Sequence, residues 1–246
     1  MRLTSVFFIL LILFSFSSCS NSTKLNIQGE EEAVSLAENM ILGLGGKKNW
    51  TKLKSVYIRT ITRDMQTGDA YTFEEWINLD EPKFMNHRVK DNVHYFQIVN
   101  RNDGWLIRNQ DVALMLPAGV TSSLNWFNNF FIRNVKLLVL GGENIEVKMN
   151  EANAFDMFID SKYNCGFQLD DNYLPERYLT PTPDKRRVTL NIKKWGDYKG
   201  YKYPLVVTGE KTGSYYQTDY WDAGMQDAES SFRVTFDPYA VAENFK

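Results

Sequence analysis

Cysteine and histidine are scarce in this chain of 246 residues, where each occurs only twice. The two cysteines are Cys19 and Cys165, and Cys19 belongs to a processing site described below. Cys165 then has no partner within the chain, which excludes an intramolecular disulfide. Beside Gly166 we interpret it as a small buried packing residue rather than a nucleophile. Stability must come from an apolar core, and a hydrophobic content of 43% can supply one.

The chain also lacks an excess of charge of either sign. It has 28 basic and 30 acidic residues, giving a formal net charge of -2. Local groups of lysine, such as those within residues 47–54 and 185–194, stand among acidic residues and are typical of a solvated face. Because no strong positive field exists to attract a polyanion, nucleic acid is not an expected partner.

Motifs for metal binding and hydrolysis are missing. His87 and His94 lie in strand-like stretches separated by a turn at Asp91-Asn92, so they can approach one another, but further ligands at suitable spacing are absent. Neither an HExxH helix nor a GxSxG elbow occurs. The neighbouring acids Glu74 and Glu75 point to opposite faces of a predicted strand. We therefore expect no metal, no cofactor and no enzymatic activity.

The chain also lacks a long apolar run, since its longest uninterrupted run of apolar residues, Val6–Phe14, has nine residues. A membrane-spanning helix needs about 20. Arg2 precedes this run, and Ser17 and Ser18 follow it and lead into Cys19, which is the layout of a secretory signal. We predict that residues 1–18 form a cleaved signal peptide.

The next stretch, SNSTKLNIQG at residues 20–29, is polar and without periodicity. We predict that residues 19–29 form a flexible tether, which would reach at most about 35 Å when extended. No linker divides the remainder, so residues 30–246 are expected to form a single domain.

The first half of this domain begins with a helical pattern and continues with strands. Apolar residues recur at helical spacing from Glu30 to Leu44, where glycines end the helix, and residues 47–53 can add a helical turn. Alternating patterns separated by short turns then predict an antiparallel meander. Its strands are residues 56–61, 71–79, 84–89, 93–100 and 105–109.

A second helix is predicted over residues 121–140, capped by Thr121 or Ser122 and ended by Gly141-Gly142. Its stripe is rich in phenylalanine and leucine, so it needs an apolar surface to cover. Strands resume after it at residues 145–149, 155–160, 167–169, 177–180, 188–194, 203–208 and 215–221, with an edge strand at 232–236. The predicted fold class is α+β, a curved antiparallel β-sheet, or incomplete barrel, wrapped around helices.

The order of helix, meander, covering helix and second meander resembles the lipoprotein-carrier superfamily, which includes LolA, LolB and related lipid-binding lipoproteins. Short stretches that resemble this family are Leu44-Gly45-Gly46, Asp103-Gly104-Trp105, Leu169-Asp170-Asp171, Leu174-Pro175-Glu176-Arg177, Asp197-Tyr198, Tyr203-Pro204 and Phe236-Asp237-Pro238. Phe16-Ser17-Ser18-Cys19 is similar to the lipobox of bacterial lipoproteins, although Phe16 stands where leucine is usual. The resemblance implies lipidation at Cys19 and an apolar cavity that holds acyl chains.

From these features we expect a monomeric envelope protein, anchored to the outer membrane by lipid at Cys19 and facing the periplasm. Its expected ligand is a lipid, an acyl chain or a lipoprotein, and the apolar part of this ligand is expected to enter the cavity. An alternative is a glycan-binding or assembly module that uses C-terminal aromatic residues such as Trp195 and Trp221. The residues expected to line the cavity are Val56, Ile58, Phe73, Phe96, Ile98, Leu124, Phe127 and Phe131.

Overall fold

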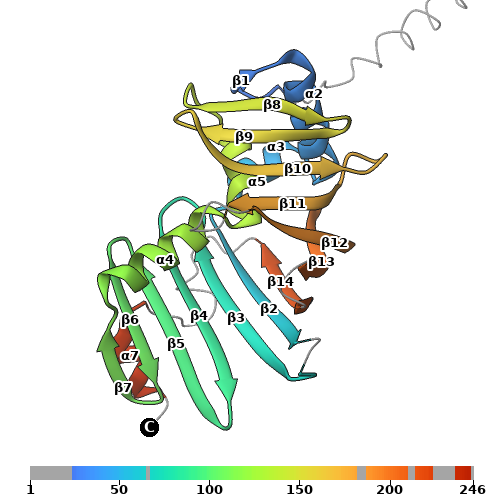
Figure 1. Cartoon of the computed structure of the whole chain (residues 1–246). Helices are drawn as coiled ribbons and strands as arrows, with labels where there is room; N and C mark the ends of the chain where they lie inside the picture. The colour runs from blue at the N-terminus through green and yellow to red at the C-terminus, as the bar shows by residue number, and fades with distance from the viewer. Residues whose placement is uncertain (1–23, 65–66, 182–186, 210–213, 224–235, 245–246) are drawn as a thin grey trace, which may run out of the picture.

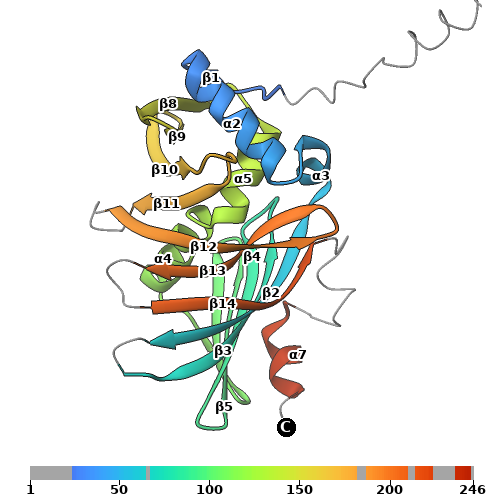
Figure 2. The ribbon, with the colours of Figure 1, turned by 90° about the vertical axis from the view of Figure 1, so that its right-hand side faces the viewer.

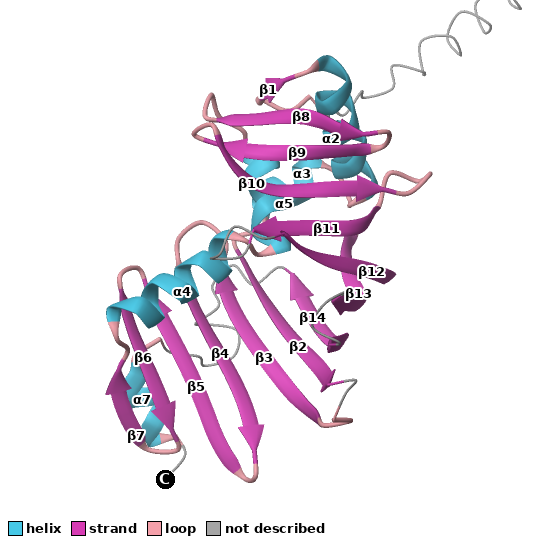
Figure 3. Cartoon of the chain, viewed as in Figure 1, coloured by secondary structure: helices cyan, strands magenta, loops and turns pink. Residues whose placement is uncertain are grey.

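The computed structural model describes residues 24–64, 67–181, 187–209, 214–223 and 236–244. These residues form one 14-stranded sheet with helices on both of its faces (Figures 1 and 3). Neighbouring strands pair antiparallel throughout, with one parallel exception between β1 and β8. The predicted α+β class with a curved, open antiparallel sheet is confirmed.

The first meander supplies one half of the sheet. Its two-residue turn at Asp91 and Asn92, both with positive φ, lies where the sequence predicted one. Such left-handed turns match the twist of the flanking strands and suit Asp and Asn. The strands are β2 (Ser55–Asp64), β3 (Ala70–Asn78), β4 (Lys83–Lys90), β5 (Val93–Asn100), β6 (Asp103–Arg108) and β7 (Asp111–Leu114).

The second meander continues the sheet and joins the first because β14 pairs with β2. The edges of the sheet, β1 and β7, do not pair with each other, so the barrel stays open. This meander also contains the parallel edge strand β1 (Gln28–Gly29). The other strands are β8 (Ile145–Glu151), β9 (Ala154–Ile159), β10 (Lys162–Leu169), β11 (Pro175–Pro181), β12 (Arg187–Tyr198), β13 (Tyr201–Gly209) and β14 (Ser214–Ala223).

Four helices lie on the concave face of the sheet. They are α2 (Glu31–Gly43), α3 (Lys47–Lys52), α4 (Pro117–Asn128) and α5 (Phe131–Leu140). Strands β8–β12 curve around α2, α3 and α5, while α4 lies across one end of β4–β6 (Figure 1). Helix α5 is buried on nearly all sides, which explains why its apolar residues are not confined to one stripe.

The opposite face of the first meander carries the short helix α7 (Pro238–Glu243), so α4 and α7 lie on opposite sides of this part of the sheet (Figure 2). Consecutive strand residues point to opposite faces, and each face therefore has its own apolar cluster. The cluster under α7 consists of Tyr57, Trp76, Met85, Phe96, Ile98, Ile107, Phe236, Val241 and Ala242.

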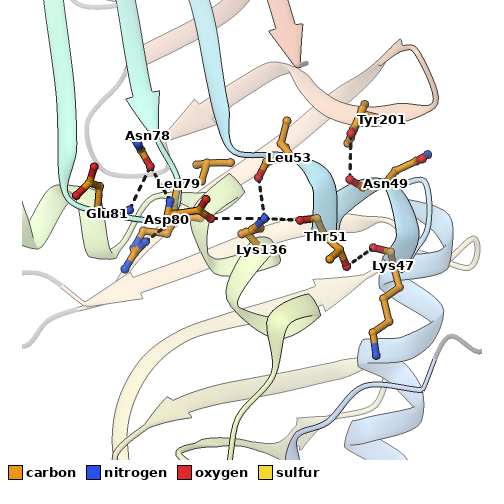
Figure 4. A network of polar contacts seen from close by, with 11 residues as sticks. Lys47, Asn49, Thr51, Leu53, Asn78, Leu79, Asp80, Glu81, Lys136 and Tyr201 are labelled. Atoms are coloured by element: carbon orange, nitrogen blue, oxygen red, sulfur yellow. Dashed lines mark hydrogen bonds and ion pairs between the residues drawn. The ribbon is translucent and has the colours of Figure 1, made fainter. Parts of the chain in front are cut away.

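A buried lysine fixes α5 to the sheet and to α3 (Figure 4). Lys136 is only 2% exposed, and its Nζ donates to the backbone oxygens of Thr51 and Leu53, both at 2.8 Å. Asp80, in the turn between β3 and β4, lies 3.6 Å from the same Nζ. Burial lowers the pKa of Lys136, and the nearby Asp80 opposes that shift. This ammonium group therefore links three separate segments at the point where α5 meets the sheet.

The predicted single helix over residues 121–140 is wrong, because the chain breaks between α4 and α5 at Asn129 and Phe130. Tertiary hydrogen bonds stabilise this break. The hydroxyl of Tyr178 donates to the backbone oxygen of Asn129 at 2.8 Å, and the Asn134 amide donates to that of Asn128 at 3.1 Å. Helix α4 also begins earlier than predicted, with Pro117 in its first turn.

Other sequence boundaries change too. Leu25 is buried and residues 28–29 pair with β8, so the predicted tether over residues 19–29 is too long at its C-terminal end. Helix α7, which is capped by Asp237, was not predicted from the sequence. The predicted edge strand at 232–236, the signal peptide 1–18 and Cys19 lie outside the described residues, apart from Phe236. Within the described ranges, no helix has the length and apolarity needed to cross a membrane.

Candidate functional site: an apolar hollow beneath α4 and α5

A hollow of about 470 Å³ lies on the concave face, between the sheet and the junction of α4 with α5. This volume falls within the range of about 300–1,000 Å³ that is usual for small-molecule sites. Strands from both meanders form its walls. The described lining residues are Ile58, Thr60, Thr62, Tyr71, Phe73, Glu75, Trp126, Asn129, Phe130, Phe131, Ile132, Tyr178, Thr180, Leu190, Pro204, Val207, Tyr216 and Thr218.

Strand alternation explains the contribution of the sheet. In β2, Ile58, Thr60 and Thr62 are spaced by two and share the concave face, as do Phe73 and Glu75 in β3. The register places Ile58 directly opposite Glu75 and Thr60 directly opposite Phe73. Threonine methyl groups make this wall largely apolar while their hydroxyls leave hydrogen-bonding sites within it.

The break between the helices supplies the other wall. Trp126 lies near the end of α4, Phe130 in the break, and Phe131 and Ile132 in the first turn of α5. Phe131 is held edge-on against Tyr178, with ring centroids 5.2 Å apart. A single continuous helix would direct these side chains around one axis, so the break is what turns this aromatic group toward the sheet.

Glu75 is the one acidic or basic residue among the described residues that line the hollow. It is 8% exposed, and burial raises the pKa of its carboxyl to about 8. Within the described part of the chain, no hydrogen bond or ion pair to this carboxyl is formed. A carboxyl at this position is largely protonated at neutral pH unless a cation accompanies it.

The residues that the sequence placed at the cavity are dispersed by the structure. Ile58, Phe73 and Phe131 line the hollow. Val56 and Phe127 are fully buried in the core beside it, and Leu124 is partly buried against that core. The ring of Phe127 stacks on Phe84 at 5.7 Å, which shows that it serves packing between α4 and the sheet.

Phe96 and Ile98 do not line this hollow, contrary to the prediction, because both belong to the apolar cluster under α7. The ring of Phe96 stacks on His87 at a centroid distance of 4.2 Å. Both faces of β5 are apolar, with Val99 in the main core, so periodicity alone could not decide which face is concave.

The hollow is also lined by Trp126, Phe130 and Glu75, which were not predicted from the sequence. Trp126 and Phe130 stand close to the helix break, and their ring centroids lie 5.4 Å apart. The sequence did predict that Glu74 and Glu75 point to opposite faces of one strand, so one of the two had to face the concave side of the sheet. Which one did so depended on the sheet register.

The chain is similar to several solved structures. One is a LolA superfamily protein from Nitrosomonas europaea, with 10% identity, a TM-score of 0.45 and coverage of 77% of this chain and 92% of that chain. A second is an outer membrane lipoprotein-sorting protein domain from Vibrio parahaemolyticus, with 9% identity, a TM-score of 0.46 and coverage of 86% of this chain and 99% of that chain. A third is a DUF1329 family protein from Desulfovibrio piger, with 10% identity, a TM-score of 0.49 and coverage of 82% of this chain and 98% of that chain. Similarity at this level assigns no ligand or activity.

Comparisons by sequence gave no match, either to a family model or to a curated protein.

A second hollow, of about 500 Å³, lies on the concave face of the first meander, nearer β7. Phe73 lines both hollows, which places them side by side on the sheet. Arg88 and Arg108 flank the Tyr95 ring, at 5.3 Å and 6.0 Å from its centroid. The remaining lining residues are Asn86, Phe96, Gln97, Leu106, Ile107, Asp111 and Ala113.

The two histidines do approach one another, as the turn at Asp91-Asn92 allowed. Nε2 of His87 lies 3.0 Å from Nδ1 of His94, and Nδ1 of His87 lies 2.7 Å from the Glu74 carboxylate. The hydrogen bond to His87 lowers the pKa of Glu74. No group of three potential metal ligands occurs in the described ranges. This cluster lies on the α7 face, away from the apolar hollow.

Cys165 is fully buried, and burial raises the pKa of its thiol to about 12. The interpretation of Cys165 as a packing residue is therefore confirmed, since a nucleophile requires an accessible thiolate. The aromatic residues proposed for glycan binding are also partly buried where they are described. Trp195 packs against Phe131 at 5.9 Å, and the side chain of Trp221 lies outside the described part of the structure.

Proposed function

We propose that this protein is a lipid-anchored envelope protein that holds the apolar part of a lipid or lipoprotein in the hollow beneath α4 and α5. The observation that carries the proposal is the hollow itself, which is lined mainly by aromatic and aliphatic groups and bounded by an open sheet. Burial of an acyl chain there would be driven by removal of apolar surface from water, at about 25 cal/mol per Å². No chemical step is required.

The proposed anchor is an acylated Cys19 at the outer membrane, facing the periplasm. Support comes from the short apolar run and the lipobox-like stretch that ends at Cys19. Cys19→Ala should move the protein from the membrane fraction to the soluble fraction of the cell envelope. Retention of the variant in membranes would contradict the anchor without bearing on the hollow.

Ligand binding can be tested by filling the hollow. Val207 lines it from β13, whereas Val112 in β7 packs against the cluster on the other face. Val207→Trp should reduce the bound lipid that native mass spectrometry detects in protein purified from membranes. Val112→Trp is the matched control and should retain that lipid.

Thermal unfolding of both variants establishes that they are folded. Wild-type protein that is repeatedly free of lipid, or equal lipid in the two variants, would contradict the proposed function.

A further inference from the structure

We propose that the preferred ligand of the hollow is an amphiphile with an ammonium group, whose positive charge pairs with Glu75 while its hydrocarbon chain lies against α4 and α5. This inference rests on the proposed lipid-binding function and names the class of head group. It begins from the one ionisable acid in an otherwise uncharged, mainly apolar lining, counted over the described residues.

The position of Glu75 suits a ligand better than a structural role. Its side chain is more than nine-tenths buried yet lines the hollow, and the described chain provides neither a cation nor a hydrogen-bond donor for it. A buried acid without a partner destabilises a protein, because its charged form loses hydration and gains nothing in return. A ligand that brings the missing cation would remove that cost.

A second buried acceptor stands beside Glu75. Asn86 is directly opposite Glu75 in the register of β3 and β4, and it is 9% exposed. Its side-chain oxygen, Oδ1, has no hydrogen-bond partner in the described structure. The neighbouring Gln97 instead donates to Ser123 in α4, at 2.5 Å. Asn86 itself lines the neighbouring hollow. The strand register therefore offers an ammonium group the Glu75 carboxylate and, on the adjacent strand, one amide oxygen as acceptors for its three N–H donors.

The charge of the hollow discriminates between head groups. A phosphate or carboxylate placed there would meet Glu75 with no basic residue in the described lining, whereas an ammonium group would meet an opposite charge. The aromatic faces of Phe73, Trp126 and Phe130 add a further preference for cations. The basic residues Arg88 and Arg108 belong to the neighbouring hollow.

Binding is coupled to a proton. Glu75 is largely protonated in the free protein near pH 7 and must release its proton to solvent when the ammonium group arrives, so that a carboxylate faces the cation. The other titratable groups of the described lining are Tyr71, Tyr178 and Tyr216, and the nearest charged group on the same face of β4 is Arg88. Burial raises the pKa of Tyr178 further, so it stays neutral.

The test compares three probes of equal chain length: dodecylamine, dodecan-1-ol and dodecanoic acid, each below its micelle concentration. Delipidated wild-type protein should bind the amine roughly tenfold to a hundredfold more tightly than the alcohol, the range expected for a charge-assisted hydrogen bond. Glu75→Gln should abolish this preference and leave alcohol binding unchanged. Glu74→Gln, which alters the neighbouring acid on the other face, should keep the preference.

Proton release provides a measurement that needs no variant. Titration calorimetry at pH 7 in two buffers of different ionisation enthalpy should show release of up to one proton per amine bound and none for the alcohol. Equal affinity for amine and alcohol, or an unchanged preference in Glu75→Gln, overturns the inference. Failure of all three probes to bind instead contradicts the proposed function.

Discussion

Glu74 and Glu75 are adjacent in β3 but have opposite environments. The Glu74 carboxylate lies 2.7 Å from Nδ1 of His87 and accepts a hydrogen bond from the Tyr57 hydroxyl at 2.5 Å, on the face covered by α7. The Glu75 carboxyl faces the hollow without a partner in the described structure. Correspondingly, the pKa of Glu74 is lowered by its hydrogen bond to His87, and that of Glu75 is raised by burial to about 8.

Glu75→Gln should change how stability depends on pH. The folded-state pKa of about 8 lies above the ordinary value of 4.5, so the folded protein binds more protons between these limits. The wild-type free energy of unfolding should therefore fall as pH rises from about 4.5 to 8, by several kcal/mol at most. Denaturant unfolding across this range should show a smaller fall in the variant. Parallel profiles would contradict the raised pKa.

Lys136→Met should destabilise the protein by about 3 kcal/mol, because the backbone oxygens of Thr51 and Leu53, the latter buried, would lose their donor. Lys148→Met is a suitable control, since the ion pair of Lys148 with Glu146 is partly exposed to solvent and should contribute at most about 1 kcal/mol. Chemical denaturation measures both changes. Similar values for the two variants would show that Lys136 does not fix α5.

The close approach of α2 to the turn before β13 depends on Gly45. This residue has φ of +114°, and a Cβ atom there would overlap the backbone oxygen of Gly200. Gly45→Ala should reduce stability by more than about 1 kcal/mol. Gly46→Ala also places alanine at a positive φ, of +85°, but a Cβ atom there would meet no other atom. This control therefore measures the cost of backbone strain without the overlap with Gly200. Equal melting temperatures for the two variants would exclude a steric contribution from Gly200.

His94 should titrate below its ordinary value of 6.5. Burial lowers its pKa, and the nearby His87 adds to that effect, while Glu74 opposes it. NMR titration of the ring resonances measures this directly. His87→Phe should raise the pKa of His94 only in part, because burial is the larger cause and remains. A wild-type pKa above 6.5 would contradict this arrangement.

The sequence was sufficient for features that depend on local pattern. Helical spacing between Glu30 and Leu44 predicted α2, and the separation of two strand-like stretches predicted the turn at Asp91-Asn92. The period of two predicted most strands, and it required Glu74 and Glu75 to face opposite ways. These features follow from interactions within a few residues, which are the interactions that a sequence pattern records directly.

Only the tertiary structure decided which face of the sheet became the hollow. Phe96 and Ile98 fit an inner strand face by pattern, but α7 covers the opposite face and buries them there. The break at Asn129 is stabilised by Tyr178, which comes from β11. The environments of Glu75 and Lys136 likewise depend on segments far apart in the chain. Long-range pairing determines such sites because burial and unmet hydrogen bonds arise from neighbours in space, which alternation along one strand does not specify.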